Sequence, residues 1–189
     1  MLALSIIAPF VVYPIFLMQA LCFALFACAF NLLLGYTGLL SFGHAAFFGT
    51  AAYTTGYVVK MMGLGPAAGI FVGTVAAVAL GSVFGMLVIR KQGIYFAMIT
   101  LGLAQLLYFF FLQSSFTGGE DGIQGIPRGH FLGMINLEND RQLYYFVLTI
   151  FLFGFVVIHR TIHSPFGQVL RAIRENEPRA LSLGYDVNK

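Results

Sequence analysis

The chain has 189 residues, of which 59% are hydrophobic and 9% are charged, and its mean hydropathy is +0.89. A soluble domain carries about 25% charged residues, so this composition excludes a soluble globule and predicts an all-α integral membrane protein. The formal net charge is +3, but segment 1–59 contains no Asp, Glu, Lys or Arg. A secretory signal peptide does not explain this start, because the basic n-region is missing and apolar sequence continues well beyond an h-region.

Six membrane helices are predicted in a polytopic bundle over residues 1–159. A spanning helix needs about 20 apolar residues, and Pro9 and Pro14 divide the opening stretch into a short helix near 2–12 and a longer one over 13–34. The remaining predicted spans cover residues 45–59, 67–89, 94–112 and 142–158. Thr100 is one of the few polar residues within them.

The uncharged stretch 31–44 separates two predicted spans and contains glycines at positions 35, 38 and 43. Glycine weakens a continuous helix, and broken backbone at membrane depth is tolerated only where protein buries it or it lines a cavity. Asn31, Ser41 and His44, together with Thr100, are therefore candidates for lining a translocation path. The alternative is an ordinary turn between helices at the membrane surface.

A four-residue repeat of small side chains runs along the predicted span 67–89. In lipid, small residues at this spacing allow a second helix to approach closely, and this packing drives helix association. We therefore expect a helix-packing face, within the subunit or between subunits, rather than a transport site. Its members are Gly69, Gly73, Ala77, Gly81 and Gly85.

Charge asymmetry predicts the orientation in the membrane. The loop 114–141 has four acidic and two basic residues, a net charge of 2 − 4 = −2, whereas segment 160–189 has five basic and three acidic residues, a net charge of 5 − 3 = +2. Positive charge favours the cytoplasmic side, so the acidic loop is expected outside and segment 160–189 inside, with Arg90 and Lys91. Lys60 then falls outside, as a mild exception, and Met1 falls inside.

Segment 160–189 is predicted to contain two short amphipathic helices. Ser164 and Pro165 read as an N-cap followed by proline at the first helical position. An apolar stripe follows at helical spacing, Phe166, Val169, Leu170 and Ile173, with Arg171, Arg174 and Glu175 outside it. A second helix is expected over 178–183, ended by Gly184. We interpret the segment as a docking surface for a soluble partner; the alternative is a solvated loop.

Several classes of function are weakly supported. No Asp, Glu, Lys or Arg lies within a span, which disfavours an ion-coupled carrier, although a partner-independent secondary carrier or channel remains the competing class. Ser41 and His44 could meet on a helix as nucleophile and base, but no third orienting group accompanies them. No phosphate-binding loop and no metal-ligand spacing occurs, and Cys22 and Cys28 are too far apart along one helix for a disulfide. The residues thus favour a transporter subunit driven by a partner.

The stretch from Asn31 to Tyr53, NLLLGYTGLLSFGHAAFFGTAAY, resembles the permeases of ABC importers for branched-chain amino acids. Three further motifs resemble the M-type (LivM-type) subunit of that family: IYFAMITL from Ile94, the glycine-rich stretch 117–127, and SPFG…RAIRE from Ser164. The resemblance covers most of the chain in order. Importers of urea and short amides look similar, so it is less specific for the substrate.

This resemblance implies a multi-pass protein of the bacterial inner membrane that is not itself an enzyme and carries no cofactor. The implied partners are an H-type permease, two cytoplasmic ATPases that bind the ATP, a periplasmic binding protein and membrane lipid; no nucleic acid is implied. Glu177, Ala180 and Gly184 match the loop that such permeases insert into their ATPases, with Arg171, Arg174 and Glu175 preceding it. Family members continue with further spans, so the chain is expected to be a C-terminally truncated fragment.

Overall fold

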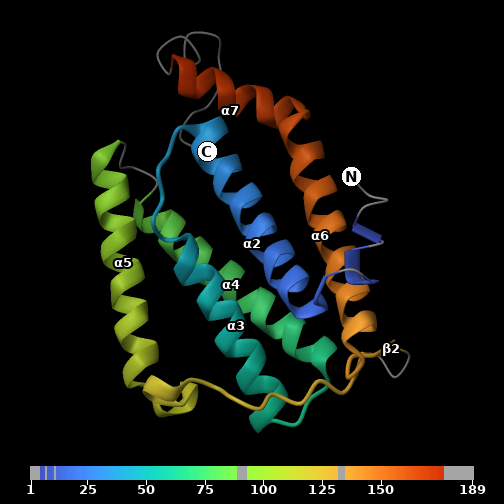
Figure 1. The fold of residues 1–189 in the computed structure, drawn as a ribbon. Coiled ribbons are helices and arrows are strands. Elements are labelled where there is room, and N and C mark those ends of the chain that lie inside the picture. The colour runs from blue at the N-terminus through green and yellow to red at the C-terminus, as the bar shows by residue number, and fades with distance from the viewer. Residues whose placement is uncertain (1–4, 7, 11, 89–92, 132–134, 177–189) are drawn as a thin grey trace. The chain divides into compact units, whose positions relative to one another are not determined.

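Helices form almost all of the regular structure in the computed structural model (Figure 1). It describes residues 5–6, 8–10, 12–88, 93–131 and 135–176, and only the backbone at positions 130, 135 and 136. Within this part of the chain, the strands are the antiparallel pair β1 (His130–Phe131) and β2 (Ile135–Asn136). The helices are η1 (Ala8–Phe10), α2 (Pro14–Leu32), η2 (Leu33–Thr37), α3 (His44–Met61), α4 (Pro66–Val88), α5 (Ile94–Gln113), η3 (Ser115–Thr117), η4 (Gly119–Asp121), α6 (Asp140–Ile162) and α7 (Pro165–Glu175).

Four of the described helices are long and apolar enough to cross a membrane: Pro14–Thr37, Pro66–Val88, Ile94–Gln113 and Asp140–Ile162. Large apolar side chains cover their outer surfaces; Met86 on α4 is 79% exposed and Phe153 on α6 is 72% exposed. Surfaces of this kind are stable only against lipid or another protein. The predicted all-α, multi-pass membrane protein is confirmed.

The predicted count of six spans is not confirmed. α3 is a continuous helix over the predicted third span, but it is rich in small and hydroxyl side chains and is not among the four apolar helices. In the segment 2–12, the structure describes residues 5–6, which are helical, the three-residue η1 and residue 12, so the short helix predicted there stays a prediction. The hydroxyls of Tyr144 and Tyr145 donate to carbonyls in this segment, at Ser5 and Ile6.

The chain forms two compact units, one of residues 1–40 and 144–189 and the other of residues 41–143. The first contains α2, η2, most of α6 and α7; the second contains α3, α4, α5 and the long loop before α6. This division describes packing and does not address the predicted boundary at residues 159/160, which concerns the end of the membrane bundle.

In the first unit, close approaches at two glycines fix α6 against its neighbours. A Cβ at Gly154 would lie 2.8 Å from the Leu25 side chain of α2, and a Cβ at Gly167 would lie 2.4 Å from the Ile162 carbonyl oxygen. The Ser164 hydroxyl donates to the Thr161 carbonyl at 2.6 Å and accepts from the Gly167 amide at 3.4 Å. The elbow between α6 and α7 is therefore tightly packed, with the predicted N-cap and proline in place.

In the second unit, α4 packs along α3 through the first half of the small-residue repeat (Figure 1). A Cβ at Gly73 would lie 2.7 Å from the Ala51 carbonyl oxygen, and one at Gly69 would lie 2.5 Å from Val59. The Thr55 hydroxyl donates to the Gly69 carbonyl at 3.1 Å. Ala77 is half-buried and a Cβ at Gly81 would only just reach Phe47, while Gly85 has open space around it. The first half of the small-residue repeat, at Gly69 and Gly73, therefore packs closely against α3 in this unit, and the second half does not.

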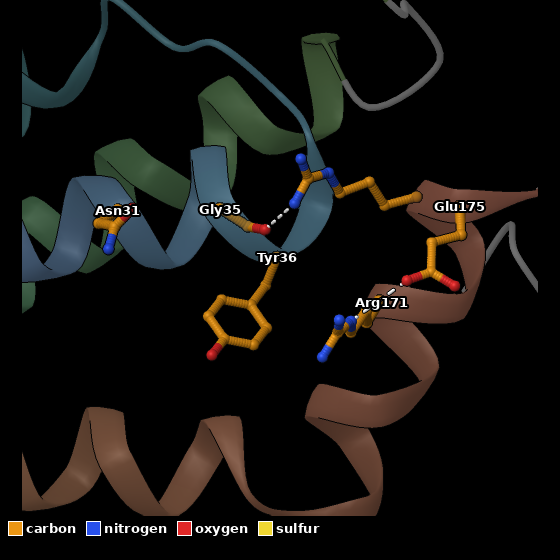
Figure 2. A pocket seen from close by; sticks show the side chains of 6 residues that line it. Asn31, Gly35, Tyr36, Arg171 and Glu175 are labelled. Atoms are coloured by element: carbon orange, nitrogen blue, oxygen red, sulfur yellow. Dashed lines mark hydrogen bonds and ion pairs between the residues drawn. The ribbon is translucent and has the colours of Figure 1, made fainter.

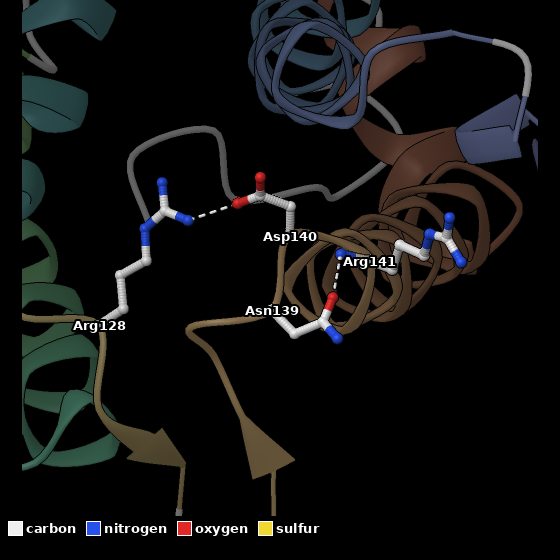
Figure 3. Close-up of polar contacts among 4 residues, drawn as sticks. All are labelled: Arg128, Asn139, Asp140 and Arg141. Atoms are coloured by element: carbon white, nitrogen blue, oxygen red, sulfur yellow. Dashed lines mark hydrogen bonds and ion pairs between the residues drawn. The ribbon is translucent and has the colours of Figure 1, made fainter.

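The loop between α5 and α6 is fastened to the helices of its own unit by polar contacts. Arg128 and Asp140 form an ion pair at 2.5 Å, and the Asn139 side chain accepts from the Arg141 amide at 3.1 Å (Figure 3). The Lys60 ammonium at the end of α3 donates to the Gln124 carbonyl at 2.6 Å. Lys60, the exception in the predicted charge distribution, thus contacts the backbone of the acidic loop.

The α3–α4 contact leads to a test with a matched control. We expect Gly73→Ala to destabilise the protein by about 1–3 kcal/mol, because the added methyl group meets the α3 backbone. Gly85→Ala, on the same helix in open space, is expected to leave stability unchanged or to raise it by up to about 1 kcal/mol, because alanine favours a helix more than glycine does. Thermal unfolding in detergent measures both, and equal stability of the two variants would contradict this packing.

Candidate functional site: the helix break after α2

The predicted interruption of the helix near Gly38 is confirmed. α2 continues into η2, a five-residue π-helix, and the chain leaves the helix at Gly38, whose φ is +74°. Residues 39–41 are not helical, and α3 begins at His44. Short π-helical segments are rare and frequently mark functional sites. The two sides of this break belong to different units and are described separately.

On the first side, the guanidinium of Arg174 on α7 reaches back to the end of α2. Its Nη1 donates a hydrogen bond to the Gly35 carbonyl oxygen (Figure 2). A Cβ at Gly38 would lie 3.1 Å from Arg174 Cγ, so the aliphatic stem of the arginine lies directly against this glycine. The last carbonyls of a helix lack intrahelical donors and carry partial negative charge, so a cationic donor is well matched to this position.

A cavity of about 530 Å³ lies beside this contact. Figure 2 shows the Tyr36 ring and the Arg171 guanidinium pointing into the open space, while the Nε of Arg171 pairs with Glu175 at 3.2 Å. The side chains of Arg171 and Glu175 are 70% and 68% exposed, so this pair adds little stability. The lining residues are Asn31, Gly35, Tyr36, Arg171, Arg174 and Glu175.

On the second side, two buried hydroxyls satisfy the backbone before α3. The Phe42 amide donates to Thr100 Oγ1 on α5 at 3.2 Å, and the Gly43 amide donates to Ser41 Oγ at 3.2 Å. Ser41 and Thr100 are each 4% exposed. The Thr100 hydroxyl itself lies 3.0 Å from carbonyl oxygens in the preceding turn of α5. The Ser41 and Thr100 hydroxyls thus accept hydrogen bonds from the backbone amides of the break, as water does in a solvent-exposed loop.

A largely apolar groove of about 310 Å³ lies between α3 and α5 next to this point. Tyr53 and Phe111 stack with ring centroids 5.0 Å apart and line one part of it. Gly49 has open space where a Cβ would stand, and Gln105 adds an amide to the lining. The groove can accept an apolar side chain or a packing helix.

One of the four predicted path residues belongs to a different unit from the other three. Ser41, His44 and Thr100 lie in the second unit, where the His44 ring also bonds the Ser41 backbone. Asn31 belongs to the first unit and lines the cavity with the predicted coupling residues.

The coupling residues Arg171, Arg174 and Glu175 lie on α7, as predicted. Glu177, Ala180, Gly184 and the predicted second helix over 178–183 lie outside the described residues. Within the described part of the chain, no three His, Cys, Asp or Glu side chains are grouped as a metal site would require, and Cys22 and Cys28 are free thiols.

Sequence reasoning did not identify the contact between Arg174 and the end of α2. The sequence pattern indicates only that Gly35 and Gly38 weaken a helix, and it places Arg174 among the residues expected to face a partner. The two sites are 139 positions apart, and the packing of α6 on α2 at Gly154 and the tight elbow at Gly167 bring them together. The local signal in the sequence was the glycine at position 38, since glycine commonly ends a helix in the left-handed conformation that the structure shows there.

Comparison with known proteins identifies the chain's relatives. The family described as the permease component of branched-chain amino acid transport systems matches residues 13–189. The high-affinity branched-chain amino acid transport system permease proteins LivM of Escherichia coli K12 and Salmonella typhimurium LT2 are each 29% identical over 182 residues. In each case the match covers 82% of this chain and 42% of the relative. No solved structure matches significantly.

Thr100 provides a test of how the break is held. Thr100→Val keeps the shape but removes the acceptor of the Phe42 amide in a part-buried hydrogen bond, so we expect a loss of about 1–3 kcal/mol. Thr100→Ser keeps the hydroxyl and should recover most of that loss. Unfolding of the purified protein in detergent measures both variants, and a valine variant as stable as wild type would contradict the hydrogen bond.

Proposed function

Because the chain belongs to the family of permease components of branched-chain amino acid transport systems, we propose that it is a permease subunit of an ATP-binding-cassette importer. In this proposal it forms part of the inner-membrane path for leucine, isoleucine and valine, which a periplasmic binding protein delivers. An H-type permease completes the path, and two cytoplasmic ATPases hydrolyse ATP. The chain spans less than half the length of the LivM proteins it matches.

The observation that carries the proposal is the attachment of α7 to the transmembrane helices of its unit. α7 is amphipathic, is joined to α6 by a packed elbow, and contacts the end of α2 through Arg174. A helix fixed at two points moves with the spans as a rigid body. Force applied to α7 by an ATPase would therefore reach the membrane helices without an ionisable group inside the membrane.

The side chains that the break brings together suit a passive path. Ser41 and Thr100 are buried and engaged with backbone groups, which fits a structural role beside the path better than proton transfer. The apolar groove between α3 and α5 fits aliphatic solutes. Urea and short amides would call for more polar groups, which makes them the second choice of substrate.

Reconstitution tests the proposal. We expect proteoliposomes that hold the full-length permease pair, the ATPases and the binding protein to take up radiolabelled leucine only when ATP is hydrolysed. Urea uptake serves as the substrate control. Leucine uptake by the permease alone, without ATP or ATPases, would instead establish a partner-independent carrier or channel.

Arg171 offers a specific test of docking. Its side chain is 70% exposed and, among the residues that the structure describes, pairs with Glu175 on the same helix, so it is available to an acidic partner surface. We expect Arg171→Glu to lower copurification of the ATPases by about tenfold, and Arg171→Lys to retain most of it. Wild-type recovery of the ATPases with the glutamate variant would remove Arg171 from the docking surface.

A further inference from the structure

We propose that Arg174 is a positioning residue that couples α7 to the helix break after α2, and is not a contact to the ATPase. This inference rests on the proposed function, because it concerns how ATPase closure would reach the path. It assigns Arg174 a partner within its own chain, the Gly35 carbonyl, in place of the partner-facing role that its sequence position suggested.

The first observation is the direction in which the Arg174 side chain points. Arg174 lies in the last turn of α7, and its Nη1 bonds the Gly35 carbonyl at the end of α2 (Figure 2). Both positions are helix C-termini, where partial negative charge accumulates. The guanidinium thus brings positive charge to the C-terminal part of η2, and its removal leaves the Gly35 carbonyl without that donor.

The second step is the fit between Arg174 and Gly38. The arginine stem passes so close that a Cβ at Gly38 would be 3.1 Å from Cγ and 3.5 Å from Cδ. The backbone at Gly38 has φ +74°, which glycine adopts without strain. The residue that ends the helix is therefore also the residue against which the arginine packs, so a displacement of α7 acts directly on the turn.

The third step is the contrast between the two arginines of α7. Arg171 bonds Glu175 one turn away on the same helix, whereas Arg174 bonds a residue 139 positions away in the sequence. The exposed ion pair can be replaced by water at little cost. The Arg174 contact is exposed as well, but it joins α7 to a second transmembrane helix, so a displacement of α7 acts on that helix in addition to the packing of α6 on α2.

The test compares docking, ATP hydrolysis and uptake in the reconstituted transporter. We expect Arg174→Ala to keep the ATPases bound and hydrolysing ATP, while leucine imported per ATP falls by about tenfold or more. Arg174→Lys retains a cationic donor and should recover part of the loss. Gln168→Ala, an exposed side chain on the same helix, is the control and should leave the ratio unchanged.

Alanine variants of two glycines distinguish a loss of coupling from an effect of backbone strain alone. Gly38→Ala should lower the ratio as Arg174→Ala does, whereas Gly63→Ala should not, since Gly63 has a similar φ of +65° with open space around it. The double variant Gly38→Ala with Arg174→Ala should show less than the sum of the two effects, because truncating the arginine removes its contact with the new methyl group.

The outcomes distinguish this inference from the proposed function. An unchanged ratio of leucine to ATP in Arg174→Ala, or a loss of ATPase binding in that variant, overturns the positioning role and leaves the importer standing. Absence of ATP-driven leucine uptake in the wild-type transporter overturns the proposed function itself, before any variant is compared.

Discussion

The structure depends on how polar backbone is satisfied where a helix breaks in a chain with almost no charge. A helix within a membrane can end only if its carbonyls and the following amides find partners in the protein. Between Gly35 and Gly43 those partners are side chains: Arg174 for a carbonyl on one side, and Thr100 and Ser41 for amides on the other. Arg174 comes from α7 and Thr100 from α5, whereas Ser41 belongs to the break itself.

The need to satisfy the backbone at this break also connects the fold to the proposed transport cycle. In its unit, α7 is joined to α6 through a glycine elbow and to α2 through one guanidinium. In the other unit, α3 and α4 share a glycine contact and α5 supplies the hydroxyl that holds the start of α3. Packed elements of this kind respond to force as discrete rigid bodies rather than by continuous deformation. A helix break whose backbone groups bond to defined side chains is well suited to rigid-body movement of this kind.

Much of this organisation could be predicted from the sequence, because the chemistry is local. Apolar length located α2, α4, α5 and α6 to within a few residues, and Ser164 with Pro165 located the start of α7. The first predicted span, near 2–12, is described only at residues 5–6, 8–10 and 12, so it stays a prediction. The partner of Arg174 could not be predicted, because helical spacing shows which face an arginine occupies and not which distant helix end it reaches. Likewise, the spacing of Gly69 through Gly85 could not show that only the first two glycines lie tightly against α3.

The central claim is that the break after α2 responds to the ATPases through α7. Hydrogen exchange of the assembled transporter, read by mass spectrometry on peptides covering residues 31–44, tests it most directly. The account predicts that exchange in these peptides changes between the ATP-bound and nucleotide-free states, together with the peptides of α7. Exchange at 31–44 that is identical in the two states, while α7 changes, would contradict it.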